Sequence, residues 1–255
     1  MSGHSKWATI HRQKETADQK RGQIFTKIGN AITVAVREGN GITDPNLNFK
    51  LRLALEKAKE VNMPKDNIQR AIDRAVGASG AQALEEVSYE GYGPGGVAVM
   101  VEAATDNRQR TVQEIKNIFE RSGGSLGSPG AVSFLFKKVG LVVVAKGENA
   151  QETSLKLIDL GAEEVEEVED GIEVYVGVDK LEEIKKKISE SGLEVLRSEL
   201  TAKPTTFVQI LDEKVAARIL NLMEKLDSHS DVLKVYANFD IPQEILEKVK
   251  LGQIQ

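Results

Sequence analysis

The hydrophobic period of this chain changes near residue 77, and that change limits what the chain can fold into. Before residue 77, apolar residues recur three times at the three- and four-residue spacing of a helix face, with no strand between them. Gly39, Gly41 and Gly77 follow these segments as helix breakers, and Pro64 suits the first turn of the third. The apolar positions are Ile24, Ile28, Ala31, Ile32 and Ala35, then Leu47, Leu51, Leu55 and Ala58, then Ile68, Ala71, Ile72 and Ala75.

Short apolar strands alternate with amphipathic helices after residues 77–86, which read as a linker, and residues 89–96, which read as a Gly/Pro turn. Residues 141–196 follow the order β-α-β-β-α-β, which is the ferredoxin-like unit. The flanking segments, with strands at 97–103, 131–137, 206–211 and 232–239, join into a second such unit. The first unit would then be inserted at the middle hairpin of the second, since hairpin tips tolerate insertions.

The predicted fold class is therefore α+β, with an N-terminal three-helix domain and two ferredoxin-like βαββαβ domains, one inserted in the other. The predicted boundaries are 1–77 for the helical domain with an N-terminal arm, 86–137 with 203–240 for the discontinuous domain, and 138–202 for the inserted one.

Composition excludes several classes of protein. The chain has no cysteine, which excludes disulfide scaffolds, thiol catalysis and iron–sulfur clusters. Its longest apolar run is about five residues, too short for a membrane span, and residues 1–23 are too polar for a signal peptide. We therefore expect a cytoplasmic protein.

Charge is divided unevenly along the chain. Residues 1–76 carry 14 Lys/Arg against 8 Asp/Glu (+6), whereas the remaining 179 residues carry 20 against 31 (−11). A basic head favours a polyanionic partner, because a polyanion responds to the local field rather than to the net charge. An accidental charge bias on solvated helices explains the same numbers, so both interpretations stay open at this point.

Two basic groups are the candidate nucleic-acid contacts. The arm and first helix concentrate cations around Trp7, the single tryptophan, which could stack on a base. A second group, Arg52, Lys57, Lys59, Lys65, Arg70 and Arg74, lies on the next two helices, where it could equally be the polar side of amphipathic helices. The predicted nucleic-acid-binding residues are His4, Lys6, Trp7, Arg12, Lys14, Lys20, Arg21, Lys27, Arg52, Lys57, Lys65 and Arg70.

Nothing in the sequence favours an enzyme, a cofactor or a metal site. His4 and His11 fall in the arm, and His229 falls in a polar loop where we expect a surface histidine. Gly91–Gly96 matches G-x-G-x-x-G but precedes a strand, so it is interpreted as a turn rather than a dinucleotide site. Residues 106–111, with two arginines, open a helix that could dock an anion, although a helix cap is the favoured interpretation.

Several motifs in sequence order resemble the YebC family. They are GHSKW at 3–7, KRG at 20–22 with IFTK at 24–27, NMPKDNI at 62–68, YEGYGPGGV at 89–97, TDNR at 105–108 and VYANF at 235–239. The resemblance implies a helical domain and two α/β domains around an acidic or polar cleft. It also implies DNA binding and transcription control, as in several members, or translational activation, as in others.

We therefore expect a non-enzymatic, DNA-binding regulator of gene expression. The first alternative is a ribosome-associated translation factor that binds RNA, because RNA presents the same phosphates. The second alternative is an enzyme that uses an acidic cleft, which strongly perturbed convergent carboxylates would support.

Overall fold

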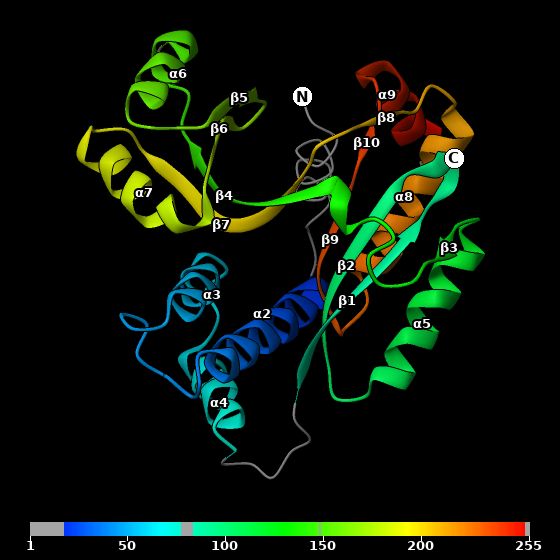
Figure 1. The fold of residues 1–255 in the computed structure, drawn as a ribbon, viewed down its shortest axis with the longest axis horizontal. Coiled ribbons are helices and arrows are strands. Elements are labelled where there is room, and N and C mark those ends of the chain that lie inside the picture. Colours follow the sequence, from blue (N-terminus) through cyan, green and yellow to red (C-terminus); the bar gives the residue numbers. More distant parts are fainter. Residues whose placement is uncertain (1–17, 78–83, 148, 253–255) are drawn as a thin grey trace. The chain divides into compact units, whose positions relative to one another are not determined.

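The computed structural model describes residues 18–77, 84–147 and 149–252, which form two compact units. The inserted unit spans Phe134–Phe207, and the main unit comprises the described residues on either side of it. Figure 1 shows the helices and strands of both units coloured along the chain. The sequence-based boundaries of three domains stay a prediction.

Three helices open the main unit, namely α2 (Asp18–Glu38), α3 (Phe49–Glu60) and α4 (Lys65–Ala75). They form one core around Ile32, Leu51 and Ala58, which are fully buried, as the helical period predicted. The side chain of Asn48 connects two of them, because it accepts from Leu51 N (3.0 Å) at the start of α3 and donates to Ala35 O (2.8 Å) in α2. Leu47 does not join this core: it precedes α3 and is 74% exposed, contrary to the pattern.

The main-unit sheet has the strand order β3-β1-β2-β9. Its strands are β1 (Glu85–Tyr92), β2 (Ala98–Thr105), β3 (Ser125–Leu126) and β9 (Val232–Ala237), with α5 (Arg108–Arg121), α8 (Glu213–Asp227) and α9 (Gln243–Gly252) as helices. β8 (Val208–Gln209) and β10 (Phe239–Asp240) form a separate parallel pair. The mixed fold with βαβ units is confirmed, but its strands in this sheet differ from those predicted.

Two segments account for that difference. Residues 89–96 are not only a turn, because Glu85–Tyr92 forms β1, which pairs with the whole of β2 around the tight turn η1 (Pro94–Gly96). Residues 131–137 are not a strand of this sheet, because η2 (Ser133–Leu135) interrupts them and Phe136 begins β4. β1, which the sequence-based assignment did not count as a strand, lies between β2 and β3 in the sheet.

The inserted unit has the predicted order of elements: β4 (Phe136–Val144), α6 (Ala150–Asp159), β5 (Glu164–Val168), β6 (Gly171–Val176), the short turn η3 (Val178–Lys180), α7 (Leu181–Glu190) and β7 (Val195–Pro204). The antiparallel sheet has the order β5-β6-β4-β7, as in a ferredoxin-like unit. A Cβ at Gly140 would lie 2.9 Å from Leu181 Cβ, so α7 covers the face that also bears Val142 and Val144.

Candidate nucleic-acid interface and the loop that carries His229

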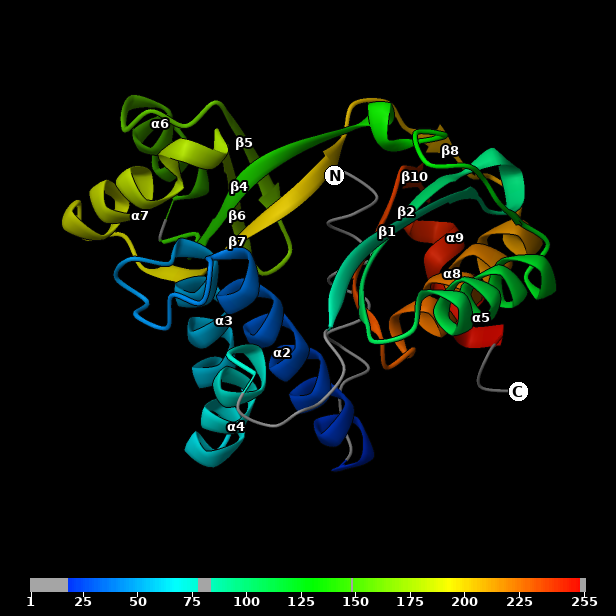
Figure 2. The ribbon, with the colours of Figure 1, turned by 60° about the horizontal axis from the view of Figure 1, so that its bottom comes forward.

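The predicted nucleic-acid contacts whose side chains are described lie on the three N-terminal helices of the main unit, which Figure 2 shows in blue and cyan. Arg21 is exposed in the first turns of α2, and only the backbone of Lys20 is described there. The remaining predicted contacts in the arm, His4, Lys6, Trp7, Arg12 and Lys14, lie outside the described residues.

Lys27 is engaged inside the main unit. Its ammonium donates to the backbone oxygen of Asp227 and forms a 3.0 Å ion pair with the Asp227 carboxylate. The Lys27 side chain is only 16% exposed, so a phosphate would have to displace an existing carboxylate to reach it. Asp227 is the last residue of α8, where a cation is also favoured by the helix dipole.

Arg52 and Arg70 are partly committed to their own surroundings. Arg52 lies over the Phe49 ring, 5.5 Å from its centroid, and donates to Pro45 O (3.1 Å). Arg70 is exposed and donates to the Asn67 side chain and to Asp66 O (3.3 Å). Arg52 is half-buried and Arg70 is exposed, and both guanidinium groups donate to nearby backbone carbonyls.

Lys57 and Lys65 are the predicted contacts that the fold leaves most available. Both are exposed, and neither forms an ion pair with another described side chain. Lys57 lies in the last turn of α3 and Lys65 begins α4, so they flank the short α3–α4 turn. Lys59 is exposed beside them, although it was not among the chosen contacts, and its place in the last turn of α3 could have identified it.

Arg74, which belongs to the second basic group, forms hydrogen bonds between the N-terminal helices. Its guanidinium donates to Asn30 Oδ1 (2.9 Å) and Thr33 Oγ1 (2.9 Å), both uncharged. Burial without a carboxylate partner lowers the pKa of Arg74 from its ordinary value. The basic group therefore divides into arginines that bond to neighbouring groups of the fold and exposed lysines without a described ion pair, a division that the helical pattern did not show.

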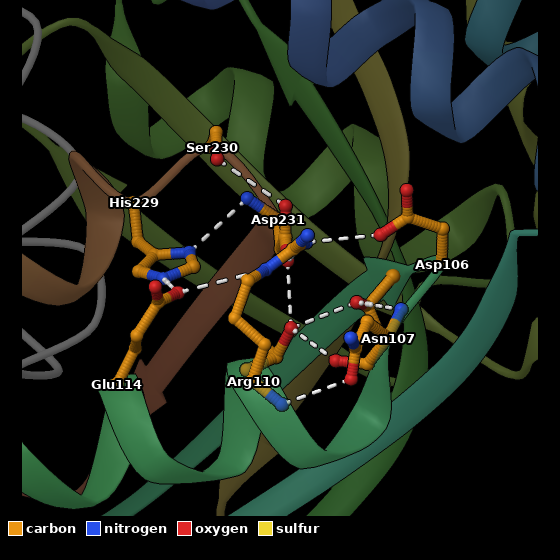
Figure 3. Close-up of polar contacts among 9 residues, drawn as sticks. Asp106, Asn107, Arg110, Glu114, His229, Ser230 and Asp231 are labelled. Atoms are coloured by element: carbon orange, nitrogen blue, oxygen red, sulfur yellow. Dashed lines mark hydrogen bonds and ion pairs between the residues drawn. The ribbon is translucent and has the colours of Figure 1, made fainter.

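The loop that carries His229 joins α8 to β9 and meets the start of α5 (Figure 3). Asp231 accepts from Arg110 Nη2 (2.7 Å) and from Thr111 Oγ1 (2.7 Å). Burial alone would raise the pKa of Asp231, but these two hydrogen bonds and the positive charge of Arg110 hold it below its usual value. The sequence did not point to this network, because its members are about 120 residues apart.

His229 is not the surface residue that was expected, since its side chain is 12% exposed. Its Nε2 lies 2.8 Å from Glu114 Oε2, and its Nδ1 accepts from Asp231 N (3.1 Å). An acceptor at Nδ1 places the ring hydrogen of a neutral imidazole on Nε2, which then donates to Glu114. Figure 3 shows the ring between α5 and the loop, where it links the two.

The start of α5 is a helix cap, as favoured from the sequence. Asn107 Oδ1 accepts from Arg110 N (3.0 Å). Arg108 pairs with Glu85 (2.6 Å), and Arg110 pairs with Asp106 (3.0 Å) as well as Asp231. Carboxylates thus occupy the two arginines that an incoming anion would need.

Three carboxylates of the inserted unit bond to neighbouring side chains. Lys203 forms 2.6 Å ion pairs with Glu164 and Glu166 and lies 3.8 Å from the centroid of the Tyr175 ring. The hydrogen bond from Lys203 lowers the pKa of Glu164. Glu173, 2% exposed, accepts from Tyr175 Oη (2.6 Å). These contacts form a network of ion pairs and hydrogen bonds that joins strands of the sheet.

Among the described residues, no cluster of three or more His, Cys, Asp or Glu side chains has the arrangement of a metal site. Within the same residues, no helix combines the length and the apolar character needed to cross a bilayer.

Two family descriptions match this chain. One, the N-terminal domain of TACO1/YebC proteins, matches residues 5–78, and the other, the second and third domains of TACO1/YebC proteins, matches residues 84–239. Relatives with the name "Probable transcriptional regulatory protein" occur in Herpetosiphon aurantiacus (49% identity over 97% of this chain and 98% of the relative) and Persephonella marina (47%, over 98% and 100%).

A solved structure shares the fold. It is a crystal structure of a conserved hypothetical protein from Aquifex aeolicus, with a TM-score of 0.83 and 42% sequence identity. The similarity covers 91% of this chain and 96% of the other.

Proposed function

Because the chain belongs to the TACO1/YebC family, we propose that it is a regulator of gene expression that binds DNA through its basic N-terminal region. The names of its relatives, probable transcriptional regulatory proteins, support the regulatory role. The protein would act in the cytoplasm by binding rather than by catalysis.

The exposed lysines at the α3–α4 turn are the observation that carries this proposal. Lys57, Lys59 and Lys65 have no carboxylate partner among the described residues, whereas Lys27 is held by Asp227. Cations without internal partners are the ones that can neutralise phosphates and release counterions. They belong, with Lys6, Arg12 and Lys14 of the arm, to the 14 Lys/Arg that outnumber the 8 Asp/Glu of residues 1–76.

Contacts of this kind would fix the position of the duplex and leave sequence choice to other features. The inserted unit carries 10 Lys/Arg against 16 Asp/Glu over residues 134–207, a net charge of −6. Its field would repel a polyanion and favour binding at the helical region.

The test compares the wild-type chain with Lys57→Ala/Lys65→Ala by fluorescence anisotropy on labelled duplex DNA over a range of salt concentrations. If both lysines contact phosphates, the slope of log K against log salt falls by about two units. The matched control is Lys146→Ala/Lys187→Ala, because those lysines are paired with Glu167 (3.0 Å) and Glu183 (2.6 Å). An unchanged slope in the first variant contradicts the proposed interface.

The same assay with RNA, joined to ribosome co-sedimentation and chromatin immunoprecipitation, tests the choice of nucleic acid. Promoter occupancy with little ribosome association agrees with DNA as the working ligand. Enrichment on ribosomes without promoter occupancy would replace it with a translation factor that uses the same lysines.

A further inference from the structure

The inserted unit ends in a two-stranded ribbon. β4 pairs with β7 from Phe136 onward, but β6 pairs with β4 only from Gly140 to Val144. Residues 136–139 and 201–204 therefore continue beyond the four-stranded sheet as a pair, which Figure 2 shows in green and yellow. Thr205 N donates to Leu135 O (2.8 Å) and extends the pairing by one residue. We call residues 134–139 with 201–207 the β4–β7 ribbon.

Two phenylalanines at the end of the β4–β7 ribbon are exposed. Phe134 is 70% exposed and Phe207 is 42% exposed. The Thr205–Leu135 hydrogen bond places Phe134 and Phe207 just beyond the last pair, one on each chain segment. Removing apolar rings from water is favourable, so two exposed rings at one end of a ribbon indicate a binding surface.

Charge on the β4–β7 ribbon is opposite in sign to that of the rest of the inserted unit. The ribbon contains three lysines and no carboxylate, whereas residues 140–200 contain 7 Lys/Arg and 16 Asp/Glu. Lys203 is held by Glu164 and Glu166, and Lys137 is 65% exposed in a 3.4 Å pair with Glu163. Lys138 is exposed and forms no ion pair with another described side chain.

We propose that the end of the β4–β7 ribbon binds single-stranded nucleic acid, with unpaired bases stacked on Phe134 and Phe207 and a phosphate beside Lys138. Aromatic rings on a ribbon that also carries an exposed cation suit this ligand, because each base offers a flat face and each linkage a negative charge. A phosphate also explains why lysine accompanies the rings here. The proposal rests on the proposed function for the class of ligand and adds a second contact, separate in sequence from the basic helices.

Stacking on a protein ring requires a base that is not already stacked in a duplex. The site should therefore bind a single strand more tightly than a duplex of the same length. RNA and DNA share the chemistry in question, so both are used as probes.

The test measures the fluorescence anisotropy of three labelled probes: oligouridylate, oligothymidylate and a duplex. Each probe has about 12 nucleotides per strand, which is within the site sizes of known single-strand binders. Phe134→Ala/Phe207→Ala should weaken binding of the single strands about fivefold to hundredfold for each stacked base, and change duplex binding little. Phe134→Trp/Phe207→Trp should retain single-strand binding. The matched control is Leu155→Ala, which removes an apolar side chain that is 65% exposed on α6.

A second variant tests the phosphate contact. Lys138→Ala should lower the salt slope for single strands by about one unit. Lys186→Ala, which removes a 77% exposed lysine paired with Glu190 on α7, should leave the slope unchanged.

Equal affinity of the double alanine variant and the wild type for both single strands overturns the proposal, as does an equal loss for single strands and duplex. A weakened affinity for RNA alone or DNA alone supports it and identifies the strand. If replacing Lys57 and Lys65 abolishes nucleic-acid binding while replacing Phe134 and Phe207 has no effect, the ribbon site is contradicted and the proposed function is not. A wild-type chain that binds none of the probes would overturn the proposed function itself.

Discussion

Glu90 illustrates how one buried charge can hold a loop in place. It lies on β1, is 6% exposed, and accepts from the backbone N–H groups of Gly130 (2.9 Å), Val132 (2.7 Å) and Ser133 (2.8 Å). Burial favours its neutral form, but these hydrogen bonds outweigh burial and lower the pKa of Glu90. The carboxylate thereby fixes the segment that leads into the inserted unit.

Glu90→Gln should lower the free energy of unfolding by about 1–3 kcal/mol at neutral pH, because an amide N–H₂ would face backbone donors. A carboxyl with a depressed pKa stabilises the folded state above its unfolded pKa of about 4.5, and this contribution disappears as pH falls through the lower folded value. The difference between wild type and variant should therefore shrink in strong acid. Urea unfolding at neutral and acidic pH measures it.

Glu194→Gln is the matched control, because Glu194 is exposed. Equal destabilisation by both changes, or a wild-type advantage that persists in strong acid, would contradict the role given to Glu90.

At the scale of elements, α2, α3 and the main-unit sheet meet at a group of like charges. Glu38 ends α2 and pairs with Lys50 of α3, while Glu86 of β1 and Glu102 of β2 contribute further carboxylates. Tyr236 of β9 donates to Glu102 (3.0 Å), and Lys234 faces Glu102 across the β2–β9 pair. The carboxylates of Glu38, Glu86 and Glu102 thus lie near two lysines, Lys50 and Lys234, where the helices pack against the sheet.

Glu86 should make stability depend on pH near neutrality. Desolvation, the hydrogen bond with Glu38 and the charge of Glu38 raise the pKa of Glu86 to about 7. A raised folded pKa gives stability that is complete below the unfolded value of 4.5 and lost as pH rises through 7. In Glu86→Gln, the free energy of unfolding in urea should therefore change less between pH 5 and 8 than in the wild type. Near pH 8 the variant should be more stable than the wild type by about 1 kcal/mol, a value that allows for solvent screening.

Glu85→Gln serves as the comparison, because Glu85 is the neighbouring residue on β1 and pairs with Arg108 instead. A profile that keeps its slope in Glu86→Gln would show that other groups titrate there.

At the scale of the whole molecule, each unit has its own buried core. Val142, Ile172 and Ile188 are buried in the inserted unit, whereas Val99, Ile115 and Ile219 are buried in the main unit. A unit that folds around its own apolar residues can open without the other, because stability is not uniform across a structure.

Ile188→Ala, at a fully buried position of α7, should destabilise the inserted unit by about 2–5 kcal/mol. Amide hydrogen exchange should accelerate in β4 and β6 and stay unchanged in β1 and β2. Equal acceleration in all four strands would mean that the two units unfold together.

The sequence alone determined the features that depend on neighbours along the chain. Helical spacing predicted α2, α3 and α4, and the order of segments predicted the inserted βαββαβ unit. Residues 106–111 were interpreted correctly as a helix cap, which Asn107 provides. Local period and capping chemistry are properties of short segments, so they can be read without a fold.

Only the tertiary structure decided which charges have partners and which strand lies beside which. It placed β1 between β2 and β3, joined Lys27 to Asp227, and brought His229 against Glu114. These pairs join residues that are far apart in the sequence, and local pattern contains no information about them. Ion pairing and burial depend on position in space, and they distinguish the lysines at the α3–α4 turn from those that the fold already uses.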